Sequence, residues 1–377
     1  MRVAMLVLLA ALAGVTAVGL APATGAPSGR SVGPGTILLR LRQPGPGGPI
    51  EAYVLRVDLA DPAVRAGLLY PGAVAAVQTL SAMANGAGAF AAVNGDFFNI
   101  GASGAPVGPV VSDGVLIKAP QPGRALAAGV GTDGVGRIAT VRLRGSVRLP
   151  GGREALSDLN DANPGFAPML APGGIGLFTT SWGRYPREGA VRGLGSVTEV
   201  LVRRGRVARV RHHARAGAVP AGSYVLLGAG SGGRALARLR IGQAVSVDYG
   251  QSTPGAVPFR FAIGGKYRLL RDGLIQRGLP SAPGAPRTAV GFSDGGHVMY
   301  LVVTEGPRAG VPGLDLPQLA AFLRGLGVRN AVALDDGGST TIVVRLPAHP
   351  GLVVLNRPSD GSEREVANGI GLFAGTT

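Results

Sequence analysis

Two stretches of the sequence place polar side chains directly after buried-looking apolar runs. Residues 94–96 read Asn-Gly-Asp after the apolar run 90–93, and residues 335–339 read Asp-Asp-Gly-Gly-Ser after the apolar run 331–334. Carboxylates at such positions can transfer protons, and a Gly-Gly turn lets backbone amides approach an anion closely. Because Asn, Asp and Gly also form ordinary tight turns, that alternative has equal weight for either stretch taken alone.

The position of the second stretch favours a functional site. The sequence pattern predicts a strand at 298–303, a helix at 317–326 and a strand at 331–334. These three elements form a plausible crossover unit with parallel strands. In crossover sheets, ligand-binding groups gather just beyond the carboxyl ends of strands, which is where Asp335 stands.

Short alternating runs typical of strands dominate the rest of the chain. Asp-Gly turns at 272–273 and 294–296 separate several of them and favour hairpins. A second helix is expected at 77–84, before an apolar strand at 90–93. Many strands with few helices predict an α+β fold with a large mixed β-sheet core. The expected strands lie at 52–57, 197–202, 207–210, 244–249, 298–303, 341–345 and 370–373.

The amino terminus has the pattern of a secretion signal. Arg2 precedes an apolar run that continues to about Ala21, and small residues follow. We expect a signal peptide at 1–26, cleaved after Ala23 or Ala26, and a secreted or cell-envelope protein with no membrane span after cleavage. A membrane-spanning helix is the alternative for the same run, although glycines and alanines dilute its hydrophobicity.

Composition narrows the possible partners and chemistry. The chain has 377 residues and no cysteine, which excludes disulfides, thiol nucleophiles and cysteine metal sites. Its net charge of +16 weakly favours an anionic substrate. The arginines are scattered singly along the sequence and aromatic residues make up 5%, so there is neither a basic stripe nor a stacking platform, and we expect no nucleic-acid partner.

Three further motifs fail on their context. Residues 291–295 match the nucleophile elbow of serine hydrolases, but a strand rather than a helix follows them. Residues 228–233 imitate a dinucleotide fingerprint without the acidic residue at the usual distance. The four histidines never show the spacing of a zinc helix. We therefore expect no cofactor and assign no metal, although Asp96, Asp335 and Asp336 together could bind a hard cation through oxygen ligands.

Four ordered motifs stand out along the chain. They lie at 94–98 with 104–108 and 112–114, at 286–291, at 334–341, and at 356–360 with 363–364. With these motifs the chain resembles the phosphodiester glycosidases, the family of the lysosomal enzyme that uncovers mannose 6-phosphate. Members of this family often carry Gly at the positions of Asp96 and Asp336, which leaves Asp335 as the stronger candidate.

The resemblance implies hydrolysis of a sugar-1-phosphodiester at the sugar C1–O bond, which releases the free sugar and a phosphomonoester. Asp335 would activate water or stabilise the developing sugar cation, and Arg287 would hold the phosphate with its planar fork. Asp96 and Glu305 complete the candidate catalytic set, although Glu305 is equally an ordinary turn residue. The candidate substrate-binding residues are Asn94, Thr288, Gly337, Gly338, Ser339, Asn356 and Arg364.

Two of these assignments have structural alternatives. Arg287 could form a surface ion pair, and Arg364 could simply pair with Glu363. Asn94 would bind a sugar hydroxyl or acetamido group, and the amides of residues 337–339 would lie near the phosphate.

The resemblance also sets the expected domain organisation. After the signal peptide we expect a linker at 27–50 and one phosphodiester glycosidase-like domain at 51–377. Its motif-bearing parts are 88–120 and 260–377, around a strand-rich middle at 137–259. The leading hypothesis is a hydrolase acting on an N-acetylglucosamine-1-phosphodiester or a similar substrate. The alternative is a non-catalytic cell-surface module that binds anionic glycans.

Overall fold

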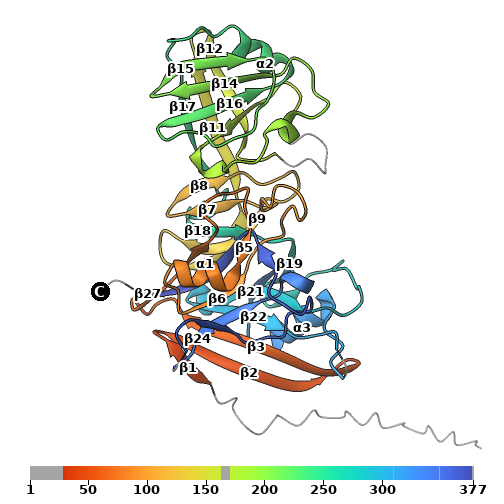
Figure 1. Cartoon of the computed structure of the whole chain (residues 1–377). Coiled ribbons are helices and arrows are strands. Elements are labelled where there is room, and N and C mark those ends of the chain that lie inside the picture. Colours follow the sequence, from red (N-terminus) through yellow and green to blue (C-terminus); the bar gives the residue numbers. More distant parts are fainter. Residues whose placement is uncertain (1–28, 163–169, 309, 348, 376–377) are drawn as a thin grey trace, which may run out of the picture.

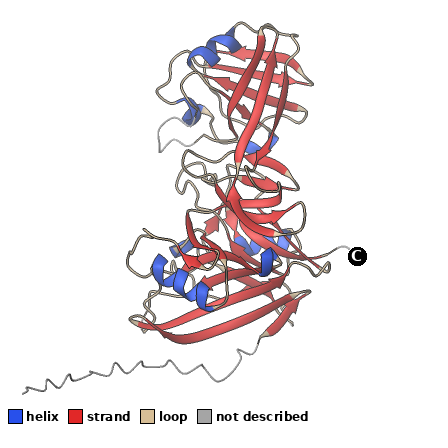
Figure 2. Ribbon diagram, turned by 180° about the vertical axis from the view of Figure 1, so that it is seen from behind, coloured by secondary structure: helices blue, strands red, loops and turns tan. Residues whose placement is uncertain are grey.

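The computed structural model describes residues 29–162, 170–308, 310–347 and 349–375. The expected signal peptide at 1–26 lies outside these residues. The described part is built mainly of strands and has three α-helices, which confirms the predicted α+β class with few helices (Figure 2). None of its helices has the length and apolar character needed to cross a bilayer.

The largest sheet has eight strands, and all its neighbouring strands run antiparallel. Helix α3 (Leu316–Gly325) leads from β22 to β23. Because β21 lies between β22 and β23 and is antiparallel to both, these two strands run parallel to each other, as predicted for the crossover unit. The order across the sheet is β1 (Arg30–Gly33), β2 (Thr36–Gly45), β3 (Gly48–Asp58), β22 (Val298–Thr304), β21 (Arg287–Ser293), β23 (Asn330–Ala333), β19 (Tyr267–Arg271) and β20 (Leu274–Ile275).

The first strands correct the expected linker at 27–50. Residues 30–45 form β1 and β2, and β2 pairs with β3 along its whole length. Leu38 packs against one core cluster while Leu39 and Leu41 pack against another. The Pro and Gly residues that suggested a linker instead close the tight turn between β2 and β3, where Gly45 pairs with Gly48.

A second, five-stranded sheet packs against the first. Its strands in order are β25 (Leu352–Val354), β24 (Ile342–Arg345), β6 (Ala91–Asn94), β27 (Gly369–Ala374) and β4 (Val64–Leu69). Buried side chains of both sheets, such as Val93 and Val332, meet in one core cluster. Helix α1 (Leu80–Gly86) packs on Ala92 and Val343 of the second sheet, and β5 (Gln78–Thr79) pairs with β26 (Glu365–Val366).

The remaining strands extend the molecule in one direction (Figure 1). A five-stranded sheet comes first, in the order β10 (Gly136–Thr140), β9 (Leu126–Gly131), β18 (Phe259–Gly264), β7 (Val110–Ser112) and β8 (Val115–Lys118). Residues 142–252, which we name the outer lobe, form the far end. This lobe falls within the strand-rich middle expected at 137–259.

The outer lobe is one seven-stranded sheet with helix α2 (Gly230–Ala237). The sheet is mixed, because β12 and β13 run parallel while its other neighbouring strands run antiparallel. A bridge between Arg206 and Ala244 brings its two edges together around a shared core. The order is β15 (Arg206–Arg211), β14 (Thr198–Arg203), β16 (Ser223–Gly228), β13 (Ile175–Phe178), β12 (Gly152–Leu159), β11 (Arg142–Leu149) and β17 (Ser246–Ser252).

The two predicted hairpin turns are confirmed. The turn at 272–273 joins β19 to β20, and the short 3-10 turn at Asp294–Gly296 joins β21 to β22. Since β22 follows directly, residues 291–295 do not form the strand-to-helix elbow of a serine hydrolase.

Candidate active site

The eight-stranded sheet and the five-stranded sheet of β25, β24, β6, β27 and β4 together form what we name the main body. Strand ends from both of these sheets meet at one edge. The Asp335 amide, just after β23, donates to the carbonyl of Gly95 at 2.8 Å, just after β6. The Leu334 amide donates to the carbonyl of Thr288 at 2.9 Å, near the start of β21. Three motifs that are far apart in the sequence are therefore in direct contact here, as the sequence predicts for a common site.

Asn94 and Thr288 tie these segments together. The Asn94 Nδ2 donates to the Asp335 carbonyl at 2.8 Å, and its Oδ1 accepts from Thr288 Oγ1 at 2.6 Å and from the Thr341 amide at 3.0 Å. Both side chains belong to fully buried residues. These contacts shape the loop that carries Asp335.

Arg287 lies at the same edge with its guanidinium already oriented. It forms an ion pair with Asp336, and its Nε donates to the Leu314 carbonyl at 2.8 Å. Only 9% of the Arg287 side chain is exposed, against 29% for Asp336. The described residues contain no group of three or more His, Asp or Glu side chains that could hold a metal ion, so Asp96, Asp335 and Asp336 do not form such a group.

The Asp335 carboxyl has an environment unlike that of a surface aspartate. Burial raises its pKa to about 6, a hydrogen bond from the Ser339 side chain opposes the shift, and the negative charge of Asp336 adds to it. Arg364 also lowers the pKa of Asp335, and its Nη1 donates to Ser339 Oγ at 3.4 Å. A pKa near neutrality suits a group that exchanges protons with water or substrate.

Arg364 pairs with Asp360 and not with Glu363. Its Nε and Nη2 lie 2.8 and 2.7 Å from Asp360 Oδ2. Glu363 instead accepts a hydrogen bond from the Ser81 amide at 2.7 Å, in the first turn of α1.

The turn at Gly337–Ser339 depends on its glycines. Gly337 has a φ of +61°, and its amide donates to the Pro286 carbonyl at 3.0 Å. A Cβ atom on Gly338 would collide with the side chains of both Arg364 and Asp360. The second glycine therefore allows this ion pair to lie directly over the turn.

Asp96 is buried beside the same edge. Its Oδ2 accepts from the Gly108 amide at 2.6 Å, and its own amide donates to Asn368 Oδ1 at 2.8 Å. Burial raises the pKa of Asp96 to about 7, the Gly108 amide and Lys118 lower it, and the charge of Asp335 raises it further.

Asn368 is a residue that sequence reasoning missed. In the part of the chain that the structure describes, its buried Nδ2 has no hydrogen-bond partner, and the same is true of the Thr340 hydroxyl. Two such groups within one edge are unusual, because buried polar atoms nearly always find partners. The only signal for Asn368 is that Asn-Gly at 368–369 repeats the Asn-Gly at 94–95.

Glu305 and Asn356 form hydrogen bonds that position the motif at 356–360. Glu305 accepts from the Arg357 amide at 3.1 Å and from Arg308 Nη1 at 3.2 Å. Burial raises the pKa of Glu305, and the Arg357 amide and Arg308 oppose that shift. Asn356 accepts from the Ile342 amide at 2.9 Å and donates to the Thr340 carbonyl at 2.8 Å.

Lys266 is a second residue that sequence reasoning missed. Its amide donates to the Ala333 carbonyl at 3.1 Å, and its ammonium lies 5.2 Å from the centre of the Phe97 ring and 4.9 Å from that of Tyr267. A third cation therefore stands near the end of β23. The available signal is composition, since Lys118 and Lys266 are the two lysines of the chain.

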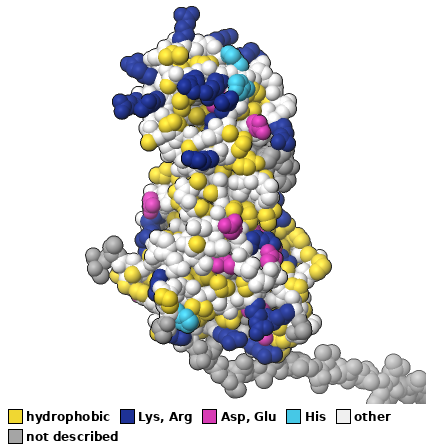
Figure 3. Space-filling view, in the orientation of Figure 1, with side chains coloured by type: hydrophobic (Ala, Val, Ile, Leu, Met, Phe, Trp, Pro, Cys, Tyr) yellow, Lys and Arg dark blue, Asp and Glu magenta, His cyan; other side chains and the backbone are white. Residues whose placement is uncertain are grey.

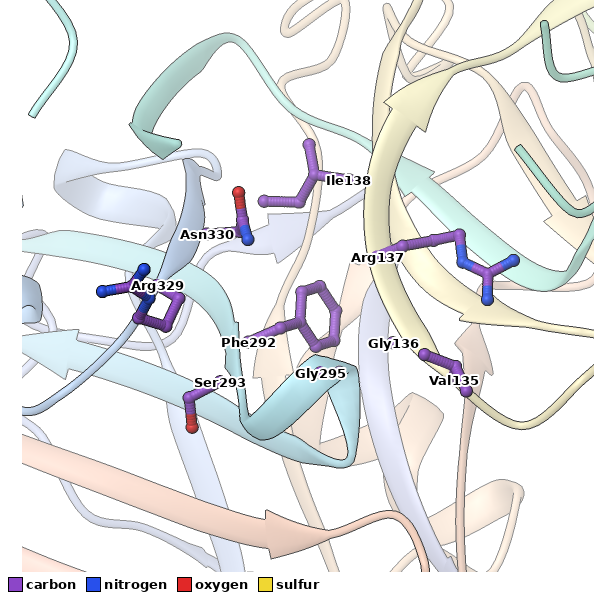
Figure 4. Close-up of a pocket in the computed structure, with 10 residues that line it drawn as sticks. Val135, Gly136, Arg137, Ile138, Phe292, Ser293, Gly295, Arg329 and Asn330 are labelled. Carbon is purple, nitrogen blue, oxygen red and sulfur yellow. The ribbon is translucent and has the colours of Figure 1, made fainter. Parts of the chain in front are cut away.

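A pocket of about 370 Å³ lies at the opposite end of β21 (Figure 4). Phe292, Ser293 and Asn330 line it, from the end of β21 and the start of β23. It contains no carboxylate and none of the predicted site residues. We therefore place the candidate active site at the Asp335 edge, where carboxylates and cations meet.

Residues 196–373 match the family model described as phosphodiester glycosidase. This match confirms the resemblance over that part of the chain, which contains Arg287, Glu305, Asp335 and Arg364. A comparison with curated proteins finds no match.

Two solved structures show that the fold has been seen before. One is a protein of Synechocystis described as hypothetical, with a TM-score of 0.73 and 23% identity, covering 90% of this chain; this chain spans 62% of its length. The other is a protein of Burkholderia pseudomallei K96243, described provisionally as exported, with a TM-score of 0.68 and 24% identity, covering 86% of this chain and 74% of its own.

A third solved structure is the catalytic domain of zebrafish N-acetylglucosamine-1-phosphodiester alpha-N-acetylglucosaminidase, auto-inhibited by its pro-peptide. Its TM-score is 0.47 at 16% identity, with coverage of 93% of this chain and 87% of that one. That likeness is too distant to carry an argument about this chain.

Proposed function

We propose that this protein is an exported hydrolase that cleaves the sugar C1–O bond of glycosyl phosphodiesters, such as an N-acetylglucosamine-1-phosphodiester. One observation carries the proposal: a buried carboxyl with a raised pKa, that of Asp335, lies with Arg287 and Arg364 at one strand edge. The match of residues 196–373 to the phosphodiester glycosidase family supports the same reaction class. Export rests on the signal pattern of residues 1–26.

Asp335 is the residue that we assign to the sugar carbon. With a pKa of about 6 it is mostly ionised at neutral pH, so it can take a proton from an attacking water. The bond from C1 to the phosphate oxygen breaks with its electron pair on that oxygen, while the water oxygen bonds to C1. The products are a free sugar and a phosphomonoester.

The leaving group explains why cations matter more here than a second carboxylic acid. A phosphate departs as a stable anion, so it needs charge stabilisation rather than a proton. The Arg287 fork, held by Asp336 and the Leu314 carbonyl, can bind two phosphate oxygens. We assign Arg364 and the Gly338 amide to the same phosphate, because the Gly337 and Ser339 amides already donate to the carbonyls of Pro286 and Asp336.

The other predicted residues support this arrangement. Asn94, Thr288 and Asn356 each bond to neighbouring backbone or side-chain groups of the site edge, so we assign them positioning roles. Asp96 and Glu305 are buried and bonded to backbone amides, which favours a positioning role for both over direct contact with substrate.

The test uses the purified protein with the methyl diester of α-N-acetylglucosamine 1-phosphate. We expect release of N-acetylglucosamine and methyl phosphate, which Asp335→Asn abolishes and Arg287→Ala strongly reduces. Asp335→Asn should retain substrate binding, measured by calorimetry, because it removes a charge and keeps the shape. Binding of the diester by the parent protein without any turnover would contradict the proposal and support the glycan-binding module.

A further inference from the structure

Positive charge is concentrated on the outer lobe. Residues 142–252 contain sixteen arginines and no lysine against six carboxylates, a net charge of +10 out of +16 for the chain. Three of those carboxylates, Asp158, Asp161 and Glu199, are buried. Figure 3 shows arginine side chains gathered over this end of the molecule. The arginines that are scattered in the sequence are therefore brought together by the fold.

Two pairs of arginines stand directly opposite each other in this lobe. Arg148 of β11 pairs in register with Arg153 of β12, and Arg203 of β14 pairs with Arg206 of β15. All four side chains are exposed. Like charges in directly opposite positions destabilise an antiparallel pair of strands. A bound anion would remove that cost.

Few carboxylates neutralise these arginines. Arg153 lies 3.8 Å from Asp248, which also lies 3.9 Å from Arg144. Within the described ranges, Arg148 and Arg203 form no ion pair with a carboxylate. The positive charge of these arginines is therefore available to bind an external anion.

The two arginine pairs flank one seam. Arg206 bridges to Ala244, just before β17, and Arg148 pairs with Ser246 at the start of β17. A pocket of about 520 Å³ lies along this seam, and Arg148, Gly205, Gln243 and Ser246 line it. We name the four arginines together with this pocket the arginine seam.

We propose that the arginine seam binds a glycosyl-phosphodiester polymer, in which sugars are joined through phosphodiester bonds, and that the substrate of the Asp335 site is such a polymer. This inference rests on the proposed function. The planar guanidinium fork matches the geometry of phosphate oxygens, and several of them in a row suit a ligand with repeated charges.

Other polyanions fit the outer lobe less well. Among the described aromatic residues of the outer lobe, Phe178 and Trp182 are buried and Tyr185, Tyr224 and Tyr249 are half-buried, so these residues offer no open platform for nucleotide bases. Ile241 is the one large apolar side chain of the described outer lobe that is strongly exposed. These residues therefore present little apolar surface for insertion into a bilayer.

The arginine seam lies far from Asp335, so a ligand that contacts both must be long. Arg148 stands near the end of β11, about 20 Å along that strand from Arg142, and the five-stranded sheet of β7 to β10 and β18 separates the lobe from the main body. A polymer held at the seam raises the local concentration of its own diester bonds near Asp335. A small diester gains nothing from the seam.

The test compares two triple variants that remove the same charge. Arg148→Gln/Arg153→Gln/Arg203→Gln changes the seam, and Arg271→Gln/Arg277→Gln/Arg324→Gln changes exposed arginines of the main body. The probe is long-chain poly(N-acetylglucosamine 1-phosphate), and binding is measured on an Asp335→Asn background so that the polymer stays intact. We expect the seam variant to bind at least about tenfold more weakly, and the control triple to bind almost normally.

Two further readouts complete the test. Turnover of the small methyl diester should be equal in parent and seam variant, and the unfolding midpoint of the seam variant should not fall, because the like-charge pairs are relieved. Equal losses of polymer binding in both triples would overturn the inference. So would equally tight seam-dependent binding of duplex DNA or of phosphatidylglycerol vesicles. Failure of the parent to cleave either substrate would refute the proposed function and leave the binding result intact.

Discussion

The ion pair between Arg287 and Asp336 joins the first residue of β21 to the loop that follows β23. Each partner fixes the other, so Asp336, which the sequence suggests only as a ligand of a hard cation, holds the Arg287 guanidinium in place. This relationship explains why two adjacent aspartates, Asp335 and Asp336, have different environments. One faces an arginine, and the other is buried with a pKa raised to about 6.

Replacement of Arg287 should therefore lower the catalytic activity, and lysine should not substitute for arginine at this position. We expect Arg287→Ala to lower kcat/KM by about 100-fold or more, as for other groups that stabilise a developing charge. Arg287→Lys should recover little, because one ammonium cannot contact the Leu314 carbonyl, Asp336 and a phosphate with the same geometry. Steady-state kinetics on the methyl diester measures both. Near-normal kcat/KM in Arg287→Lys would contradict the assigned role.

The raised pKa of Asp335 predicts the pH dependence of the reaction. If ionised Asp335 is the reactive form, kcat/KM should fall as the pH drops through about 6. The Ser339 side chain lowers the pKa of Asp335, so Ser339→Ala should move this limb to higher pH. A Ser339→Thr variant, which keeps the hydroxyl, serves as the control. A limb that stays in place in Ser339→Ala would show that another group titrates.

Asp96 predicts a pH effect on stability. Because burial raises its folded pKa from 3.8 to about 7, the folded state binds more protons between these values, and the free energy of unfolding falls as the pH rises through this window. Asp96→Asn should remove this pH-dependent loss of stability, which is of the order of 4 kcal/mol at most. Chemical denaturation at pH values from 4 to 8 measures it. A variant that unfolds more easily than the parent above pH 7 would contradict this account.

Gly338 predicts a steric effect on the phosphate site. A Cβ at this position would collide with Arg364 and Asp360, so Gly338→Ala should displace that ion pair. We expect a loss of kcat/KM of about tenfold or more, with a smaller loss of stability, since the pair is partly exposed. Gly325→Ala is the matched control, because nothing lies within 4 Å of its added Cβ. Equal activity in both variants would argue against a role for Arg364.

Much of the fold could be predicted from local patterns. The alternating runs and Asp-Gly turns gave the hairpins, and the apolar face of residues 316–326 gave α3. The prediction of a linker at 27–50 was wrong because the Pro and Gly residues near residue 45 close the hairpin of β2 and β3. The second strand of this hairpin pairs with a strand distant in the sequence, β22. Pairing between strands that are more than 200 residues apart leaves no local signal.

The candidate site was predictable in its motifs and not in its contacts. The short motifs around Asn94, Arg287 and Asp335 point to one edge, and the structure brings them there. Which carboxylate pairs with which arginine depends on packing between strands, so Asp336 with Arg287 and Asp360 with Arg364 could not be read from spacing. Asn368 and Lys266 have only weak sequence signals, a repeated Asn-Gly and the rarity of lysine, and burial and ring contacts in the structure identify them.

The position of bond cleavage tests the central claim most directly. Hydrolysis of the methyl diester in H₂¹⁸O, followed by mass spectrometry of the methyl phosphate, shows which bond the water oxygen enters. Attack at C1 predicts methyl phosphate free of ¹⁸O, with no such product from the Asp335→Asn variant. Methyl phosphate or sugar phosphate carrying ¹⁸O would show attack at phosphorus, and would contradict a glycosidase built around Asp335.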